Sequence, residues 1–210
     1  MSENLSQQSC AAFSEALASR EPVPGGGGAA ALIASLAAAL GAMAARLTAG
    51  KKKFAAFEAD HIRIITECDH LRGAFLSLIE EDAAAFEPLS CAYSMDKSSP
   101  DYAETLRAAT LHAASAPLRM MEHCCELIRL LEELPEKCSR LLLSDVGCAA
   151  LSAKAALECA SMNVFVNTRL LPEDAAAQAI AQKAESMLQD SAPRAQAVAD
   201  LVLAHLRSAK

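Results

Sequence analysis

A run of four glycines, Gly25–Gly28, follows two prolines and leads directly into a long alanine-rich apolar segment. Glycine has no side chain to block a ligand, and the first N–H groups of the helix expected there have no partners within that helix. Such a helix start binds anions and polar groups through its N–H groups and its dipole. The loop therefore predicts a ligand cradle, and a plain turn with a glycine-rich helix cap is the alternative.

One carboxylate interrupts the apolar stripe of a helix expected over residues 55–89. Asp82 takes a place in a series of apolar residues spaced three and four apart: Leu71, Phe75, Leu78, Ile79, Phe86 and Leu89. A carboxyl group shielded from water without a partner has a raised pKa and is suited to proton transfer. We therefore predict a catalytic role for Asp82, and a solvated acid at the border of the stripe is the alternative.

A helix expected over residues 136–169 carries polar side chains along one face. Asp145 lies on the same face as Asn163, about 27 Å away along the axis, and Asn167 follows one turn later. Two amides one turn apart can hold one polar edge of a ligand together. The alternative interpretation of Asp145 is that a helix begins at this point, with Ser144 or Asp145 as its N-cap residue.

Three consecutive lysines, Lys51–Lys53, follow Gly50 at the end of a helix expected over residues 28–49. Cations complement the C-terminal end of a helix dipole, so a solvated cluster is one interpretation and a docking point for ligand carboxylates is the other. Metal binding is not indicated, because no C-x-x-C pair occurs and His123-Cys124 has no partner at ligand spacing.

The composition predicts a single all-α domain over residues 1–210, an up-and-down bundle of long helices around a buried, alanine-rich central helix. Hydrophobic residues make up 53% of the chain and aromatic residues 4%, and no segment alternates as a strand does. The central helix is expected to be buried on all sides and not to span a membrane. The expected helices cover residues 5–19, 28–49, 55–89, 101–133, 136–169 and 172–207.

Gly73 is a candidate for a bend, and Pro117 and Pro193 for kinks or local helix ends. Breaks are expected at Ser98–Pro100, at Leu134-Pro135 and at Leu171-Pro172. The net charge of -7 argues against a nucleic-acid surface. The eight cysteines are scattered at helical positions without a preceding secretion signal, so we expect packed, reduced thiols in a cytoplasmic protein.

Five blocks of the chain resemble, in the same order, the cyclodeaminase/cyclohydrolase family: Pro22–Gly28, Leu47–Phe54, Asp82–Phe86, Ser144–Val146 and Asn163–Asn167. This family includes the formiminotetrahydrofolate cyclodeaminase domain and bacterial methenyltetrahydrofolate cyclohydrolases. The resemblance covers nearly the whole chain. It implies an all-helical homodimer that binds a tetrahydrofolate derivative in a cleft beside the glycine loop, with no cofactor beyond that substrate.

The activity implied by this resemblance is the conversion of 5-formiminotetrahydrofolate to 5,10-methenyltetrahydrofolate and ammonia. Asp82 is then the candidate for proton transfer, and Asp145 is the candidate for a second acid or for orienting the pterin. The glycine loop brings backbone N–H groups to the ligand, the lysines meet the glutamate tail, and the two asparagines fix orientation or support the dimer. The predicted substrate-binding residues are Pro24, Gly25, Gly26, Gly27, Gly28, Lys51, Lys52, Lys53, Asn163 and Asn167.

Two other functions stay open. One is hydrolysis of the methenyl bridge to give 10-formyltetrahydrofolate. The other is a non-catalytic folate-binding or interaction module, because Gly28 stands where relatives often have a hydroxyl residue and Ala84 where an acid is common.

Overall fold

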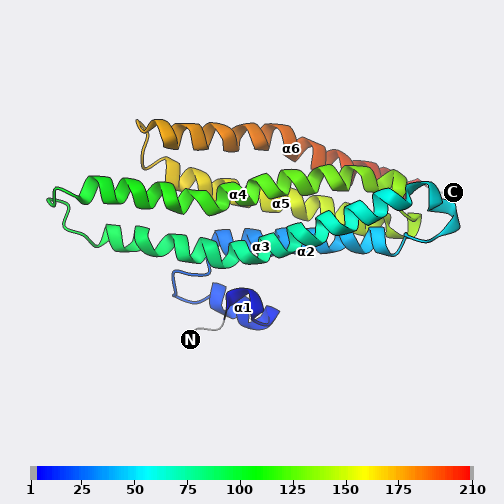
Figure 1. Cartoon of the computed structure of the whole chain (residues 1–210), viewed down its shortest axis with the longest axis horizontal. Helices are drawn as coiled ribbons and strands as arrows, with labels where there is room; N and C mark the ends of the chain where they lie inside the picture. The colour runs from blue at the N-terminus through cyan, green and yellow to red at the C-terminus, as the bar shows by residue number, and fades with distance from the viewer. Residues whose placement is uncertain (1–3, 209–210) are drawn as a thin grey trace.

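The computed structural model describes residues 4–208, and all regular secondary structure in that range is helical. Figure 1 shows long helices lying side by side, with α1 set apart from them. The α-helices are α1 (Cys10–Leu17), α2 (Gly26–Arg46), α3 (Glu58–Tyr93), α4 (Tyr102–Lys137), α5 (Leu143–Thr168) and α6 (Ala175–Arg207). Three short 3-10 helices are η1 (Leu5–Gln7), η2 (Lys52–Phe57) and η3 (Arg140–Leu142). The prediction of an all-helical bundle is confirmed.

Helix α2 packs against α3 and α5 through small side chains. Most of its alanines are buried, and a methyl group built at Gly41 would lie 3.0 Å from Leu131 and 3.3 Å from Cys68. The prediction that this helix is buried on all sides is wrong, because Leu36 on its outer side is 56% exposed and Leu47, the C-cap residue after it, is 53% exposed. Among the described residues, α2 alone has the length and hydropathy of a membrane span, but most of it packs inside the bundle, as a core helix does.

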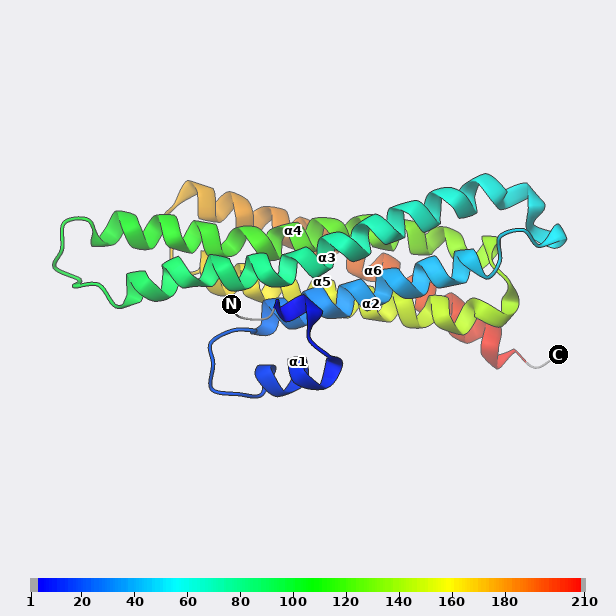
Figure 2. The same ribbon diagram turned by 60° about the horizontal axis from the view of Figure 1, so that its bottom comes forward.

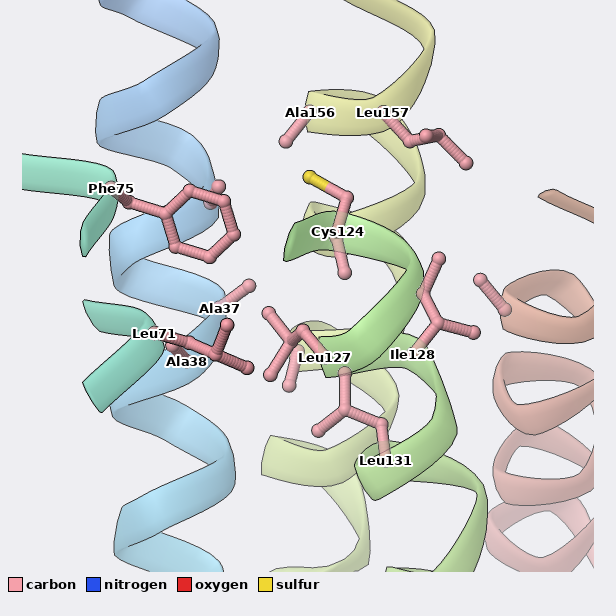
Figure 3. Close-up of a cluster of buried hydrophobic side chains, with 14 of the residues drawn as sticks. Ala37, Ala38, Leu71, Phe75, Cys124, Leu127, Ile128, Leu131, Ala156 and Leu157 are labelled. Carbon is pink, nitrogen blue, oxygen red and sulfur yellow. The ribbon is translucent and has the colours of Figure 1, made fainter. Parts of the chain in front are cut away.

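The main core lies where α2, α3, α4 and α5 meet. Figure 3 shows Leu71 and Phe75 of α3 reaching toward α2, with aliphatic side chains of α4 between α2 and α5. Small residues on α2 and α5 let these helices approach closely, and larger residues of α3 and α4 fill the remaining space. The residues labelled there are Ala37, Ala38, Leu71, Phe75, Cys124, Leu127, Ile128, Leu131, Ala156 and Leu157.

Several predicted helix boundaries are wrong. Helix α4 passes through Pro135 and ends at Lys137, because a proline near the last turn removes a single backbone hydrogen bond without ending the helix at once. Helices α4 and α6 continue past Pro117 and Pro193, so neither proline is a local helix end, and α3 continues through Pro88 to Tyr93.

The first predicted helix, over residues 5–19, is divided into η1 and the short helix α1. The Ser9 hydroxyl accepts a hydrogen bond from the Ala12 N–H at 3.1 Å and so starts α1. Within α1, Phe13 is the buried residue, and it reaches the start of α2. Figure 2 shows α1 projecting from the bundle beside α2.

A second, smaller hydrophobic cluster lies in the hairpin where α3 and α4 extend past the ends of α5 and α6 (Figure 1). It joins Leu89 and Ala92 of α3 to Ala109 and Ala113 of α4. We call residues 89–113 the arm. The ion pair between Arg107 and Asp174 links the arm to the N-terminus of α6, with 2.5 Å between Nε and Oδ2.

Cysteine burial follows the predicted packing only in part. Cys68, Cys124, Cys125 and Cys138 are buried, and burial raises the pKa of each thiol. The other four are exposed or half-buried, and all eight are free thiols. The buried thiols therefore act as small packing residues and not as nucleophiles.

Candidate active site

The glycine loop forms the N-terminus of α2. Gly25 occupies the N-cap position, and the Ala29 N–H donates to its carbonyl oxygen at 3.0 Å. The N–H groups of Gly26, Gly27 and Gly28 come before this first helical bond, so they have no partner within the helix. The preceding peptide bond, Val23–Pro24, is cis. The loop therefore presents a set of backbone donors beside the N-terminal end of a long helix dipole.

Asp82 lies directly against this turn. A methyl group built at Gly27 would sit 2.3 Å from both carboxylate oxygens of Asp82, so the acid rests on the Cα of Gly27. Neighbouring positions have more room: the methyl group would be 3.4 Å from the Asn163 amide at Gly26 and 3.3 Å from Pro24 at Gly28. Position 27 thus requires glycine because the Asp82 carboxylate occupies the space that a Cβ would take.

Asp82 stays protonated to a higher pH than an ordinary aspartate. Burial raises the pKa of Asp82 to about 6, and a hydrogen bond from the Gly28 backbone N–H acts in the opposite direction. No cation in the described part of the chain contributes to this pKa. A carboxyl group with a pKa near neutrality can both accept and donate a proton under physiological conditions.

Asn163 and Asn167 lie near the end of α5, beside the glycine loop. The side-chain N–H groups of Asn163 and Asn167 donate to backbone carbonyl oxygens of α5, those of Cys159 and Asn163 respectively, each at 2.9 Å. These bonds fix the orientation of both amides. For residues 4–208, neither bond uses the amide oxygen, so both oxygens are available to donors of a ligand.

These groups meet in one pocket of about 190 Å³. Its walls come from the loop before α2 and from α3, α4 and α5, which are distant in sequence. The lining residues are Pro22, Val23, Gly25, Gly26, Gly27, Asp82, Phe86, Ala113, Asn163, Val166 and Asn167. The volume lies below the roughly 300–1,000 Å³ of pockets that enclose a drug-sized ligand. The pocket therefore suits one end of a longer ligand.

Two of the predicted loop residues are set back from the lining. Pro24 is buried, and its ring packs against the backbone at Gly28. Both residues shape the loop from behind, whereas Gly25, Gly26 and Gly27 form the pocket wall.

The lysines and Asp145 lie at the opposite end of the bundle from Asp82. Helix α2 rises by about 30 Å between Gly26 and Arg46, and Lys51–Lys53 follow its far end. Asp145 is in the first turn of α5, whereas the asparagines are near its last turn. The N-cap of α5 is Leu142, so neither Ser144 nor Asp145 caps the helix. One copy of the chain does not bring these four residues to the pocket.

The lysine end has a hollow of its own. A cavity of about 310 Å³ is lined there by the basic residues Lys53, Arg140 and His205, by the acid Glu136 and by apolar side chains. The Lys53 ammonium lies 5.5 Å from the centre of the Phe54 ring, which is a cation–π contact.

Five pocket residues were not predicted as site residues: Pro22, Val23, Phe86, Ala113 and Val166. Phe86 is one turn after Asp82, and Val166 lies between the two asparagines in sequence. Phe86 and Val166 could have been predicted from the sequence, because each lies close to a predicted site residue on the same helix. Ala113 had no such signal, because only the packing of α3 against α4 brings it to the pocket.

A helical bundle that holds an acid of raised pKa against the N-terminus of a long helix has a pocket suited to a polar small molecule. A profile of the family described as "Formiminotransferase-cyclodeaminase" matches residues 9–186 of this chain. The chain belongs to this family.

The relatives extend this assignment. A methenyltetrahydrofolate cyclohydrolase of Methylorubrum extorquens is 37% identical over 184 residues, which cover 85% of this chain and 88% of that protein. A formimidoyltransferase-cyclodeaminase of Rattus norvegicus is 28% identical over 99% of this chain, which spans only 38% of the rat protein. The crystal structure of a formiminotetrahydrofolate cyclodeaminase from Thermotoga maritima matches with a TM-score of 0.82 and 26% identity, covering 94% of this chain and 98% of that one.

Proposed function

We propose that the Asp82 pocket binds the pterin end of a tetrahydrofolate derivative and catalyses proton transfer at the carbon that bridges N5 and N10. The observation that carries this proposal is the contact between Asp82 and the Gly27 backbone, because it puts an acid of raised pKa beside the N-terminal N–H groups of α2. The asparagine oxygens would accept hydrogen bonds from the amino and ring N–H groups of the pterin. Phe86 supplies an apolar wall for the ring.

In the cyclodeaminase reaction, N10 attacks the formimino carbon of 5-formiminotetrahydrofolate, whose formimino nitrogen is already protonated as an amidinium and becomes an amino group on the tetrahedral carbon. The new C–N10 bond forms, the proton on N10 passes to the Asp82 carboxylate, and a tetrahedral carbon results. The protonated acid then donates a proton to the formimino nitrogen as the bond to that nitrogen breaks. Ammonia leaves and 5,10-methenyltetrahydrofolate remains. One group of pKa about 6 serves both steps, and neither step requires a metal or a redox cofactor.

The cyclohydrolase reaction uses the same groups with water as the nucleophile. Asp82 accepts a proton from water as the oxygen adds to the methenyl carbon, and returns that proton to N5 as the C–N5 bond breaks. The remaining hydroxyl proton passes to solvent as the formyl C=O bond forms. The product is 10-formyltetrahydrofolate. This second function is favoured by the 37% identity to a methenyltetrahydrofolate cyclohydrolase over most of that protein's length. A non-catalytic folate-binding module is the remaining alternative.

The methenyl chromophore separates these functions in one assay. Purified protein is mixed with 5-formimino- or with 5,10-methenyl-tetrahydrofolate, and absorbance and ammonia are followed against a protein-free control. A cyclodeaminase produces the chromophore together with ammonia, whereas a cyclohydrolase removes the chromophore faster than the control. Binding without either change supports the non-catalytic module. Absence of both binding and turnover contradicts the proposed function.

A further inference from the structure

The N-terminal segment Leu5–Leu17, which contains η1 and α1, lies beside the helical bundle (Figure 2). In α1, Phe13 is buried with 4% of its surface exposed, whereas the other residues of this helix are exposed or half-buried. A helix of 8 residues is not stable by itself in water. The position of α1 therefore depends on what the Phe13 ring and the residues before α1 contact.

The Phe13 ring lies behind Gly28 at the start of α2. A methyl group built at Gly28 would meet Cζ of Phe13 at 3.9 Å and Cγ2 of Ile79 at 3.8 Å, which are ordinary van der Waals distances. Pro24 closes a third side at 3.3 Å. Three side chains, from α1, from α3 and from the loop, thus enclose one backbone position, and Phe13 is the one that comes from outside the bundle.

The backbone position that Phe13 supports is next to the contact that defines the pocket. Gly28 follows Gly27, against which Asp82 rests, and Ile79 precedes Asp82 by nearly one turn of α3. The Gly28 N–H also donates a hydrogen bond to Asp82. Support for Gly28 therefore reaches the Asp82 carboxylate through one residue of backbone and one hydrogen bond.

The residues before α1 make a second attachment, on the α3 side of the same contact. The Ser6 N–H donates to Oε1 of Glu80 at 2.8 Å, and these residues are 74 positions apart in the sequence. Glu80 precedes Asp82 by two residues on α3, and Leu5, the neighbour of Ser6, packs against the main core. The segment thus joins both elements that hold the acid, the glycine loop through Phe13 and α3 through Ser6.

Neither attachment reaches the space for the ligand. The lining of the pocket includes none of Phe13, Ser6 and Glu80, and for residues 4–208 Asp82 is the one titratable side chain in that lining. The segment can therefore act on the chemistry only through the position of the loop and of Asp82. Such positioning matters, since a misplacement of about 1 Å at a reacting group can cost roughly 100-fold in rate.

We propose that the segment Leu5–Leu17 is a positioning element of the active site, which keeps the Gly27–Gly28 backbone against the Asp82 carboxylate. Phe13 supports the loop, and the bond to Glu80 fixes the segment to α3. The effect of the segment on turnover rests on the proposed function, whereas its effect on the Asp82 carboxyl group does not. Loss of this support lets the loop move away from Asp82 and admits water to the carboxylate.

The first test is an NMR titration of the Asp82 carboxyl carbon in the full chain without folate, with Asp82→Asn to assign the signal. Burial is the larger of the two influences on the pKa of Asp82, so the water admitted in Phe13→Ala should lower this pKa from about 6 toward 3.8. Phe13→Leu keeps an apolar contact and should restore the wild-type value. Leu17→Ala is the matched control on α1, because Leu17 is 40% exposed. A pKa in folded Phe13→Ala that equals or exceeds the wild-type value overturns the proposal.

The second test removes the attachment to α3 without opening the core, and it decides the proposal if Phe13→Ala does not fold. Glu80→Ala loses the acceptor for the Ser6 N–H, whereas Glu80→Gln loses the same charge and keeps an oxygen acceptor. The pKa of Asp82 should therefore be lower in Glu80→Ala than in Glu80→Gln, and equal values overturn the role of this attachment. Glu81 pairs instead with Arg119 of α4, so Glu81→Ala and Glu81→Gln should show no such difference.

The third test measures turnover. Phe13→Ala should lower kcat by about 10- to 100-fold and move the apparent pKa of the pH–rate profile downward, whereas Phe13→Leu should restore both. A Phe13→Ala chain that is less stable but keeps the wild-type kcat and pH profile has lost only structural support, which overturns the proposal. A wild type inert toward both 5-formimino- and 5,10-methenyl-tetrahydrofolate fails the proposed function, while the titration of Asp82 still decides the positioning.

Discussion

Carboxyl groups at the two ends of the bundle have pKa values shifted in opposite directions. At the pocket end, no cation within residues 4–208 affects the pKa of Asp82, and burial raises this pKa to about 6. At the lysine end, Asp60 is hydrogen-bonded to Lys137 with 2.9 Å between the charged atoms, and this bond lowers the pKa of Asp60. Glu133 shares Lys137 and also pairs with Arg63 at 2.6 Å. Burial away from cations therefore raises the pKa of one carboxyl group, whereas hydrogen bonds and ion pairs at a more exposed place lower the pKa of the other.

The largest expected effect is on turnover. Asp82→Asn should lower kcat by about 10²- to 10⁴-fold, because the acid and base steps lose their shared proton carrier. Asp60→Asn is the matched change at the other end, and it should leave kcat within a factor of two because its partner Lys137 is far from the pocket. Steady-state kinetics with the methenyl or formimino substrate measures both variants. A similar loss of kcat in both variants would contradict the view that only the Asp82 end of the bundle takes part in proton transfer.

The second-largest expected effect is the loss of turnover when Gly27, which contacts Asp82, is replaced. Gly27→Ala places a methyl group at 2.3 Å from the carboxylate oxygens, so Asp82 must move and most turnover should be lost. Gly73→Ala on α3 is the control, since a methyl group there meets nothing within 4 Å. That control should keep full activity and gain about 0.5–1 kcal/mol of unfolding free energy from helix propensity. An active Gly27→Ala enzyme would show that the contact between Asp82 and the loop is dispensable.

The smallest effect is on stability, and its sign differs between the ends. The pKa of Asp82 rises from 3.8 to about 6 on folding, so the protonated acid is favoured in the folded state. The free energy of unfolding therefore falls by up to about 3 kcal/mol as pH rises through this window. Asp82→Asn should be more stable than wild type above pH 6, and the gain should shrink toward pH 4.

Asp60→Asn should behave in the opposite way. The pKa of Asp60 is lowered by its partners, so this group contributes stability above its unfolded pKa and loses the contribution as the pH falls. The variant should be less stable than wild type at neutral pH. Urea denaturation of both variants between pH 3 and pH 8 measures the two trends. Parallel curves for the two variants would contradict the contrast between the ends.

The sequence predicted the helical fold because periodicity and composition act locally and agree along the whole chain. It also selected Asp82, since a carboxylate on an apolar stripe is visible from spacing alone. The helix ends near Pro135 and Ser9 were misplaced, because proline costs one hydrogen bond in a last turn and serine can start a new helix.

Spacing within one helix could not show which of its ends faces a given pocket. Asp145 and Asn163 share a face of α5, yet tertiary packing leaves Asp145 at the other end from Asp82. The residues that come to the pocket from separate helices, such as Ala113, depend on pairing that no local pattern records. The contact between Gly27 and Asp82 is of the same kind, since it joins residues 55 positions apart, from 27 to 82.

The arm gives the molecule a region of low local stability. Its few buried residues form a cluster separate from the main core, so it can unfold locally at a lower free energy than the rest of the bundle. Ala113 belongs both to this cluster and to the pocket wall. Local unfolding of the arm would therefore open the pocket on its α3–α4 side. A molecule enclosed in the pocket could leave by this route no faster than the arm unfolds.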